Sequence, residues 1–142
     1  MESETKIVGY ISKKVVEELN LPEQIGKAIK MTPSLIEHIA KHSKEYKNVD
    51  SSLYTLSNLS DIINNPEFIY YNEKNKSIEY YKKQQDYVCA VVKITNKKSL
   101  FMASVYPVKK SKIDNRVERQ NWEYYLKNYK YDKEEVREKQ TS

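Results

Sequence analysis

Hydrophobic and aromatic residues in the central part of the chain fall into four short runs separated by polar connectors. The runs are FIYY, SIEYYKK, DYVCAVVKIT and SLFMASVYPV, at residues 68–71, 77–83, 86–95 and 99–108. β-Branched and aromatic residues dominate the runs, and the connectors NEKNK, QQ and NKK are two to five residues long. Connectors of this length favour an antiparallel meander. The pattern therefore predicts four consecutive antiparallel strands.

The third run shows which face of this sheet lies on a core. Val88, Ala90, Val92 and Ile94 are all apolar, whereas the positions between them are mixed. A period of two with one apolar face places that face on a core and leaves the other at least partly wet. A sheet of this size needs helices to cover its apolar face.

The clearest helical pattern covers residues 32–46. Thr32 is the expected N-cap, and Pro33 stands at the first helical position, where its missing N–H costs nothing. At about 100° per residue, one apolar stripe of this helix contains Leu35, Ile36, Ile39 and Tyr46. We expect the stripe to pack on the sheet, with His42 at the boundary between core and solvent and His38 further toward solvent.

Weaker patterns complete the predicted fold. Residues 6–12 alternate and suit a short strand, and residues 25–31 are ambiguous but allow another. Further helices are expected at residues 12–20, 57–64 and 116–130, and residues 47–54 read as a polar linker. The predicted class is α+β, with N-terminal helices packed on a four-stranded antiparallel sheet and a C-terminal helical extension. We assign residues 1–115 to one α+β domain and residues 116–142 to the extension, with Trp122 and Leu126 buried against the domain.

Composition excludes several classes of protein. The chain has 142 residues, a net charge of +5 and 39% hydrophobic residues, which suits one soluble domain with a basic balance compatible with nucleic acid. No apolar run approaches a membrane span, and the acidic N-terminus MESETK does not resemble a signal peptide. The single cysteine, Cys89, favours the cytoplasm, and two glycines are too few for glycine-rich phosphate loops.

The two histidines lie four residues apart on one helix, and three interpretations compete. A metal pair would project both imidazoles to one side, but it lacks a further ligand and the HExxH pattern. A structural role would pack His42 at the helix edge and leave His38 solvated. Acid–base chemistry is the third, because an imidazole at the rim of an apolar stripe can titrate near neutrality.

Hydroxyl and cationic side chains gather near the last strands. Ser104 and Tyr106 are two residues apart and share a face, and Lys109 follows the strand. Lys82 and Lys83 occupy opposite faces, so one of them can reach the wet face. Such groups suit metal-free RNA cleavage, in which a ribose 2′-OH attacks the adjacent phosphate, a base removes its proton and cations hold the developing charge. The plain alternative is that the lysines solvate the surface and Ser104 fills a strand position.

Four segments also resemble a known family. KIVGYISKKVVEELNL, KMTPSLIEHIAKHSKEY, LSDIINNPEFIYYNEKNKSIEYYKK and DYVCAVVKITNKKSLFMASVYPVKK are similar to the phage-associated branch of the barnase/EndoU/colicin/RelE-like nuclease superfamily. The shared features are a helix with a histidine near its end, a DII-NP helix-to-strand junction, the SIEYYKK strand and a last strand ending in Ser/Thr-x-Tyr. The resemblance runs from Val8 to Lys110, and the basic, Trp-containing C-terminal extension departs from it.

The resemblance implies a metal-independent endoribonuclease, often a toxin, that needs no cofactor. By resemblance, the helix histidine is His42, the basic residue after the paired tyrosines is Lys82 or Lys83, and the strand hydroxyl is Ser104. The predicted catalytic residues are His42, Lys82, Lys83, Ser104 and Tyr106, and the predicted substrate-binding residues are His38, Tyr81 and Lys109. The expected partner is RNA, with a cognate antitoxin or immunity protein as a further candidate and no membrane.

Two alternatives remain open at this stage. One is a non-catalytic RNA- or protein-binding module of a mobile element on the same scaffold, since fold does not fix function. The other is an inhibitor whose charged C-terminal helix is the interaction surface. Convergence of His42, Ser104 and a lysine on one phosphate-sized space would favour the enzyme.

Overall fold

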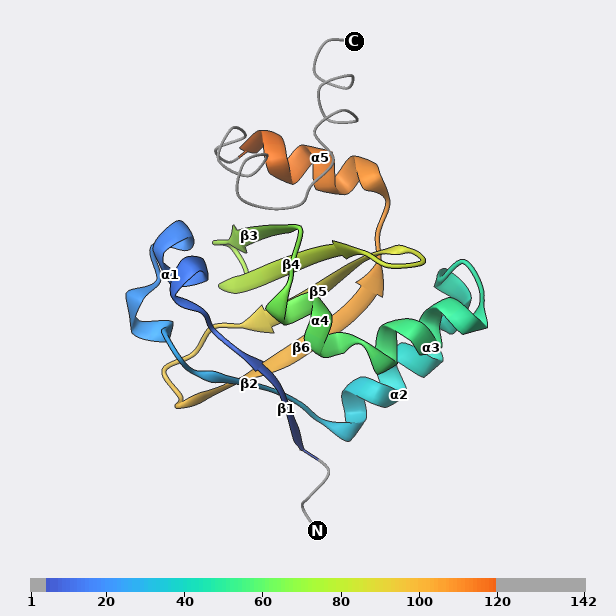
Figure 1. Cartoon of the computed structure of the whole chain (residues 1–142), viewed down its shortest axis with the longest axis horizontal. Helices are drawn as coiled ribbons and strands as arrows, with labels where there is room; N and C mark the ends of the chain where they lie inside the picture. The colour runs from blue at the N-terminus through green and yellow to red at the C-terminus, as the bar shows by residue number, and fades with distance from the viewer. Residues whose placement is uncertain (1–4, 120–142) are drawn as a thin grey trace.

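The computed structural model of the protein describes residues 5–119 and shows one six-stranded sheet with helices on both faces (Figure 1). The strand order is β1-β2-β6-β5-β4-β3. The strands are β1 (Lys6–Tyr10), β2 (Ala28–Met31), β3 (Phe68–Asn72), β4 (Ser77–Lys83), β5 (Tyr87–Lys93) and β6 (Ser99–Pro107). The four runs of the sequence pattern thus become β3 to β6, which pair as an antiparallel meander.

The predicted four-stranded antiparallel sheet is wrong, because two N-terminal strands extend it. β1 and β2 pair antiparallel, and β2 then pairs parallel with β6, which makes the sheet mixed. β2 has only four residues, AIKM, too few to show a periodicity. Its position depends on the pairing of Ile29 with Leu100, both of which are buried, and this contact joins segments far apart in sequence.

The helices are interspersed among the strands instead of preceding them. They are α1 (Lys13–Leu19), α2 (Pro33–Lys41), α3 (Val49–Ser57), α4 (Leu59–Asn64) and α5 (Lys110–Arg119), with 3₁₀ turns at Pro22–Gln24 and Ser43–Glu45. Ser12 caps α1 by accepting a hydrogen bond from the backbone N–H of Val15 at 3.2 Å. None of these helices within residues 5–119 is long and apolar enough to cross a membrane.

The predicted helix over residues 32–46 is shorter than expected. It starts at Pro33 as predicted but ends at Lys41, and His42 is its C-cap before the 3₁₀ turn. Leu35, Ile39 and Tyr46 are buried, and α2 packs against β6.

The predicted polar linker over residues 47–54 instead contains most of α3. Asn48 caps this helix by accepting the backbone N–H of Ser51 at 2.8 Å. Its buried polar residues have partners that sequence periodicity does not reveal, because Ser51 donates to Asp86 at 2.5 Å and Thr55 donates to Gln84 at 3.0 Å. Buried hydroxyls bonded in this way replace an apolar stripe.

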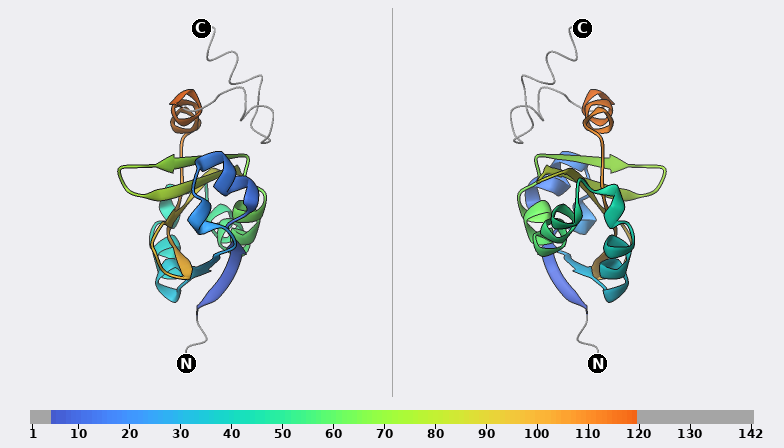
Figure 2. Two further views of the ribbon diagram at one scale, coloured as in Figure 1. Left: turned by 90° about the vertical axis from the view of Figure 1, so that its left-hand side faces the viewer. Right: turned by 90° about the vertical axis from the view of Figure 1, so that its right-hand side faces the viewer.

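The two faces of the sheet have different covers (Figure 2). α1 and α4 lie on one face, where Val88, Ala90 and Val92 are fully buried as the alternation predicts. α4 approaches β1 closely, since a Cβ on Gly9 would lie 2.7 Å from Cγ2 of Ile63. We call this the core face, and the opposite one the outer face.

α5 covers part of the outer face. It begins at Lys110 and buries Ile113 and Val117. The predicted helix over residues 116–130 therefore starts six residues early. Trp122 and Leu126 lie outside the described residues, so their burial and the division at residue 115 stay predictions.

Candidate functional site

The end of α2 carries a histidine bound to a carboxylate. Nδ1 of His42 lies 2.5 Å from Oε2 of Glu45, and both side chains are substantially exposed, at 38% and 54%. The ring of His38 lies 4.6 Å from that of His42, centroid to centroid. Glu45, three residues after His42, reaches the imidazole because the chain turns from α2 into the 3₁₀ helix at this point. A carboxylate on Nδ1 orients an imidazole and leaves Nε2 available for another partner.

Polar contacts tie this helix end to the turn between β4 and β5. Asp86 accepts the backbone N–H of Lys47 at 2.8 Å and the hydroxyl of Ser51 at 2.5 Å. Burial, followed by the negative charges of Asp86 and Glu45, raises the pKa of Tyr46 to about 12, so this tyrosine stays neutral. The segment that follows His42 is thus fixed at the start of β5.

Ser104 and Tyr106 lie on the outer face, as their spacing predicts. Ser104 pairs with Val91 and Tyr106 pairs with Cys89, and a register shift next to Val91 makes room for one extra residue in β6. The hydroxyl of Tyr106 accepts a hydrogen bond from Nζ of Lys112 on α5 at 3.0 Å. A bulge of this kind redirects the side chains that follow it.

A buried carboxylate lies on the outer face beneath α5. Glu79 of β4 accepts hydrogen bonds from the hydroxyl of Tyr81 at 2.5 Å, from Nδ2 of Asn72 at 3.1 Å and from Nε of Arg116 at 3.1 Å. The guanidinium of Arg116 also lies over the ring of Tyr70, 4.5 Å from its centroid. α5 therefore docks on the sheet through an ion pair, a cation–π contact and the apolar residues of its inner side.

Burial and neighbouring charge control the protonation of this network. Burial opposes ionisation of Glu79, but the hydrogen bonds from Tyr81 and Asn72 and the charge of Arg116 outweigh it and lower the pKa of Glu79. Burial raises the pKa of the Cys89 thiol to about 12, and burial likewise raises the pKa of Tyr81 and of Tyr106. At neutral pH the outer face thus holds one ionised carboxylate among neutral hydroxyl and thiol groups.

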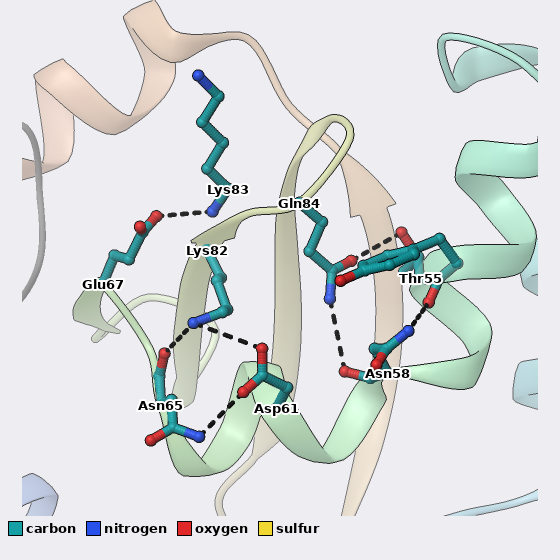
Figure 3. Close-up of polar contacts among 9 residues, drawn as sticks. Thr55, Asn58, Asp61, Asn65, Glu67, Lys82, Lys83 and Gln84 are labelled. Carbon is teal, nitrogen blue, oxygen red and sulfur yellow. Dashed lines mark hydrogen bonds and ion pairs between the residues drawn. The ribbon is translucent and has the colours of Figure 1, made fainter.

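Lys82 and Lys83 extend in opposite directions (Figure 3). Nζ of Lys82 donates to the carbonyl oxygen of Asn65 at 2.8 Å and lies 3.5 Å from Oδ2 of Asp61, so it fastens β4 to α4. Lys83 is exposed, and its Nζ lies 5.4 Å from the centroid of Tyr87. Lys83 shares the outer face with Ser104 and Tyr106, whereas Lys82 does not.

The structure brings together only part of the predicted set. Tyr106, Tyr81 and Cys89 are neighbours beneath α5, and Lys109 is exposed at its start. Tyr81 is 1% exposed, which leaves no surface for substrate while α5 is docked. Within residues 5–119, the side-chain partners of His42 are Glu45 and His38, and neither is a sheet residue.

Four polar residues escaped the sequence analysis. Glu79 is an acidic residue between two apolar ones inside a strand, which was a usable signal. Glu45 follows His42 at a helical spacing of three, which was another. Arg116 and Lys112 gave no signal, because their roles depend on where α5 lies. Across the described part of the chain, no three His, Cys, Asp or Glu side chains group closely enough to hold a metal ion.

The sequence of residues 5–115 matches the family described as phage-Barnase-EndoU-ColicinE5/D-RelE like nuclease3. The chain belongs to this family. The expected resemblance is therefore confirmed, and with it a nuclease function and a nucleic acid substrate in general terms. The family match contains every predicted site residue and Glu79, and it stops one residue before Arg116. Neither the curated proteins nor the solved structures contain a significant match to the chain.

Proposed function

We propose that the protein is a metal-independent endoribonuclease that cleaves RNA by attack of a ribose 2′-OH on the adjacent phosphate. The observation that carries this proposal is the His42–Glu45 pair, an accessible imidazole oriented by a carboxylate, in a chain of a nuclease family. Cleavage of this kind needs a proton acceptor that works near neutral pH, and imidazole is the usual choice.

In the proposed reaction Nε2 of His42 accepts the proton of the 2′-OH while the 2′-oxygen bonds to phosphorus. The bond from phosphorus to the 5′-oxygen breaks, and a proton passes to that oxygen from an acid or from water. The products are a 2′,3′-cyclic phosphate and a 5′-hydroxyl. Glu45 stabilises the imidazolium that forms, as a carboxylate does for a protonated histidine.

The outer face supplies donors for the phosphate in this proposal. Lys83 and Lys109 are exposed cations at its edge, and Ser104 and Tyr106 carry hydroxyls on it. Cations and hydroxyls directed at a phosphoryl group stabilise the charge that develops on its oxygens. We retain His38 as a substrate contact beside His42. We assign structural roles to Lys82, which binds α4, and to Tyr81, which donates a hydrogen bond to Glu79.

The biological setting that fits this reaction is a toxin-like nuclease of a mobile element, acting on cytoplasmic RNA and controlled by a cognate antitoxin or immunity protein. Its support is the phage-associated family and the unpaired, buried thiol of Cys89. Free thiols are usual in reducing compartments.

A non-catalytic binding module is the second candidate. The observation that favours it is the burial of Glu79 and Tyr81 beneath α5, together with the absence of a sheet partner for His42 within residues 5–119. A module of this kind would bind RNA without cutting it.

The deciding experiment incubates the purified full chain with single-stranded RNA in excess chelator and analyses the product ends. We expect 2′,3′-cyclic phosphate ends, and a loss of about 10²–10⁴-fold in rate for His42→Ala. Glu37→Ala, at an exposed position of the same helix, is the matched control and should be nearly silent, and each variant needs a thermal melt. If the folded wild-type chain binds varied RNAs but leaves them intact, the endoribonuclease proposal is wrong and the binding module is the better interpretation.

A further inference from the structure

Within residues 5–119, the part of the outer face formed by β1, β2 and β6 carries exposed side chains. The pairing of β1, β2 and β6 sets Ile7, Lys30 and Phe101 in one row across the three strands, and the next row contains Tyr10 and Ala28. These residues point away from the core face, since Ile29 and Leu100, which alternate with them, are buried. We call the surface formed by Ile7, Tyr10, Ala28, Lys30, Ser99 and Phe101 the β1–β2–β6 surface.

This surface exposes large apolar side chains. Tyr10 is 57% exposed, Ile7 is 51% exposed and Phe101 is 42% exposed. Single exposed apolar residues are common, but three on adjacent strands of one sheet face form a platform. Aromatic rings on an open sheet face are the usual means by which proteins stack unpaired nucleobases.

The charge of the surface favours a polyanion. The strands β1, β2 and β6 contain Lys6 and Lys30 and no acidic residue. Lys97 and Lys98 are exposed in the turn that leads into β6. Lys6 and Lys30 have no acidic partner within residues 5–119, so their charge is available to phosphates.

The surface continues into the proposed cleavage region along a single strand. Phe101 precedes Ser104 by three residues on β6, and both lie on the outer face. A nucleotide stacked on Phe101 would therefore lie near the hydroxyl of Ser104, along the direction of the strand. A strand rises about 3.3 Å per residue, so the separation is about 10 Å, within the reach of one or two nucleotides.

We propose that the β1–β2–β6 surface binds the single-stranded RNA that flanks the cleaved phosphate. Bases stack on Tyr10 and Phe101, and phosphates contact Lys30 and Lys6. This inference rests on the proposed function for the identity of the ligand. A second copy of this chain, packing on the same apolar residues, is the competing occupant.

The test measures binding of the full chain to a fluorescent single-stranded oligouridylate of about ten nucleotides with 2′-O-methyl groups, which cannot be cleaved. Phe101→Ala and Tyr10→Ala should each weaken binding about five- to a hundredfold, the range for one lost base–aromatic stack. Tyr54→Ala is the matched control, since Tyr54 is 43% exposed on α3 and should leave the affinity unchanged. Lys30→Gln should also reduce the dependence of affinity on salt.

Separate outcomes decide the inference and the proposed function. Unchanged affinity in folded Phe101→Ala and Tyr10→Ala overturns the inference, even if the wild-type chain cleaves RNA. Weakened binding in these variants supports it, even if no cleavage occurs and the binding module replaces the enzyme. Equal affinity for a duplex of the same length overturns it, because paired bases cannot stack on the surface. A concentration-dependent dimer that both variants dissociate, without change in RNA affinity, assigns the surface to a second copy instead.

Discussion

His42 and Ser104 show how much a single residue depends on its local neighbours. His42 ends α2, and its partner Glu45 belongs to the next turn, so this pair results from local backbone geometry. Ser104 instead depends on the register of β6 against β5, where a one-residue slip would turn its hydroxyl to the core face. The position of the His42 side chain therefore depends on local backbone geometry, whereas that of Ser104 depends on the pairing of two strands.

At this scale Ser104→Ala should reduce cleavage by less than about tenfold, because water can partly replace one neutral hydrogen-bond donor. The loss should be smaller than that of His42→Ala. Ser57→Ala, at an exposed position at the end of α3, is the matched control. Initial rates on one short RNA measure the effect, and a Ser104→Ala loss equal to that of His42→Ala would give the serine a larger role.

Among the elements, α4 and β1 approach each other closely at Gly9. Gly9 is buried, and a Cβ there would meet Ile63 at 2.7 Å and Oδ1 of Asn64 at 3.0 Å. We expect Gly9→Ala to lower the free energy of unfolding by about 1–3 kcal/mol, the usual cost of overpacking. In an Ile63→Ala background the same change should cost much less, which urea denaturation can measure. Equal costs in both backgrounds would show that α4 does not press on Gly9.

The docking of α5 depends on an ion pair that acid should break. The pKa of Glu79 is lowered in the fold, so its contribution to stability is present above the ordinary carboxyl pKa and is lost as pH falls through the lowered value. Glu79→Gln should cost about 3–5 kcal/mol at neutral pH, since it leaves Arg116 without its buried partner. The loss of stability on acidification should be smaller in the variant than in the wild-type chain.

The control for this prediction is an exposed ion pair. Lys13 and Glu17 lie 3.9 Å apart with exposed side chains, so Glu17→Gln should change stability by no more than about 0.5 kcal/mol. Thermal melts at several pH values between acid and neutral measure the stability of the wild-type chain, Glu79→Gln and Glu17→Gln. If the melting temperatures of the wild-type chain and of Glu79→Gln fall equally as the pH is lowered, Glu79 does not contribute to the loss of stability in acid.

For the whole molecule, the parallel contact between β2 and β6 joins the N-terminal hairpin to the meander. β2 lies between β1 and β6, so its amides have partners although the strand is short. Hydrogen exchange should show that the amides of β2 are as protected as those of β5. Rapid exchange throughout β2 would contradict the six-stranded sheet.

The sequence by itself determined the elements whose signals are local. Alternation over β5, Ser12 before α1, Pro33 at the first position of α2, and short polar connectors each depend on neighbours within a few residues, and the corresponding strands and helix starts are where the pattern predicts. The two-residue spacing of Ser104 and Tyr106 is local in the same way. The family is likewise a property of the sequence alone.

Only the tertiary structure decided what depends on distant partners. β2 is a strand because β6 pairs with it, and α3 buries serine and threonine because Asp86 and Gln84 accept their hydrogen bonds. The pKa of Glu79 is lowered because Tyr81, Asn72 and Arg116 donate hydrogen bonds to it, and Arg116 comes from α5. Lys82 and Lys83 are equivalent in the sequence pattern. Lys82 pairs with Asp61 because α4 packs on the face of the sheet to which Lys82 points. The physical reason is the same throughout, because hydrogen bonds and ion pairs between segments far apart in the chain leave no periodicity in the sequence.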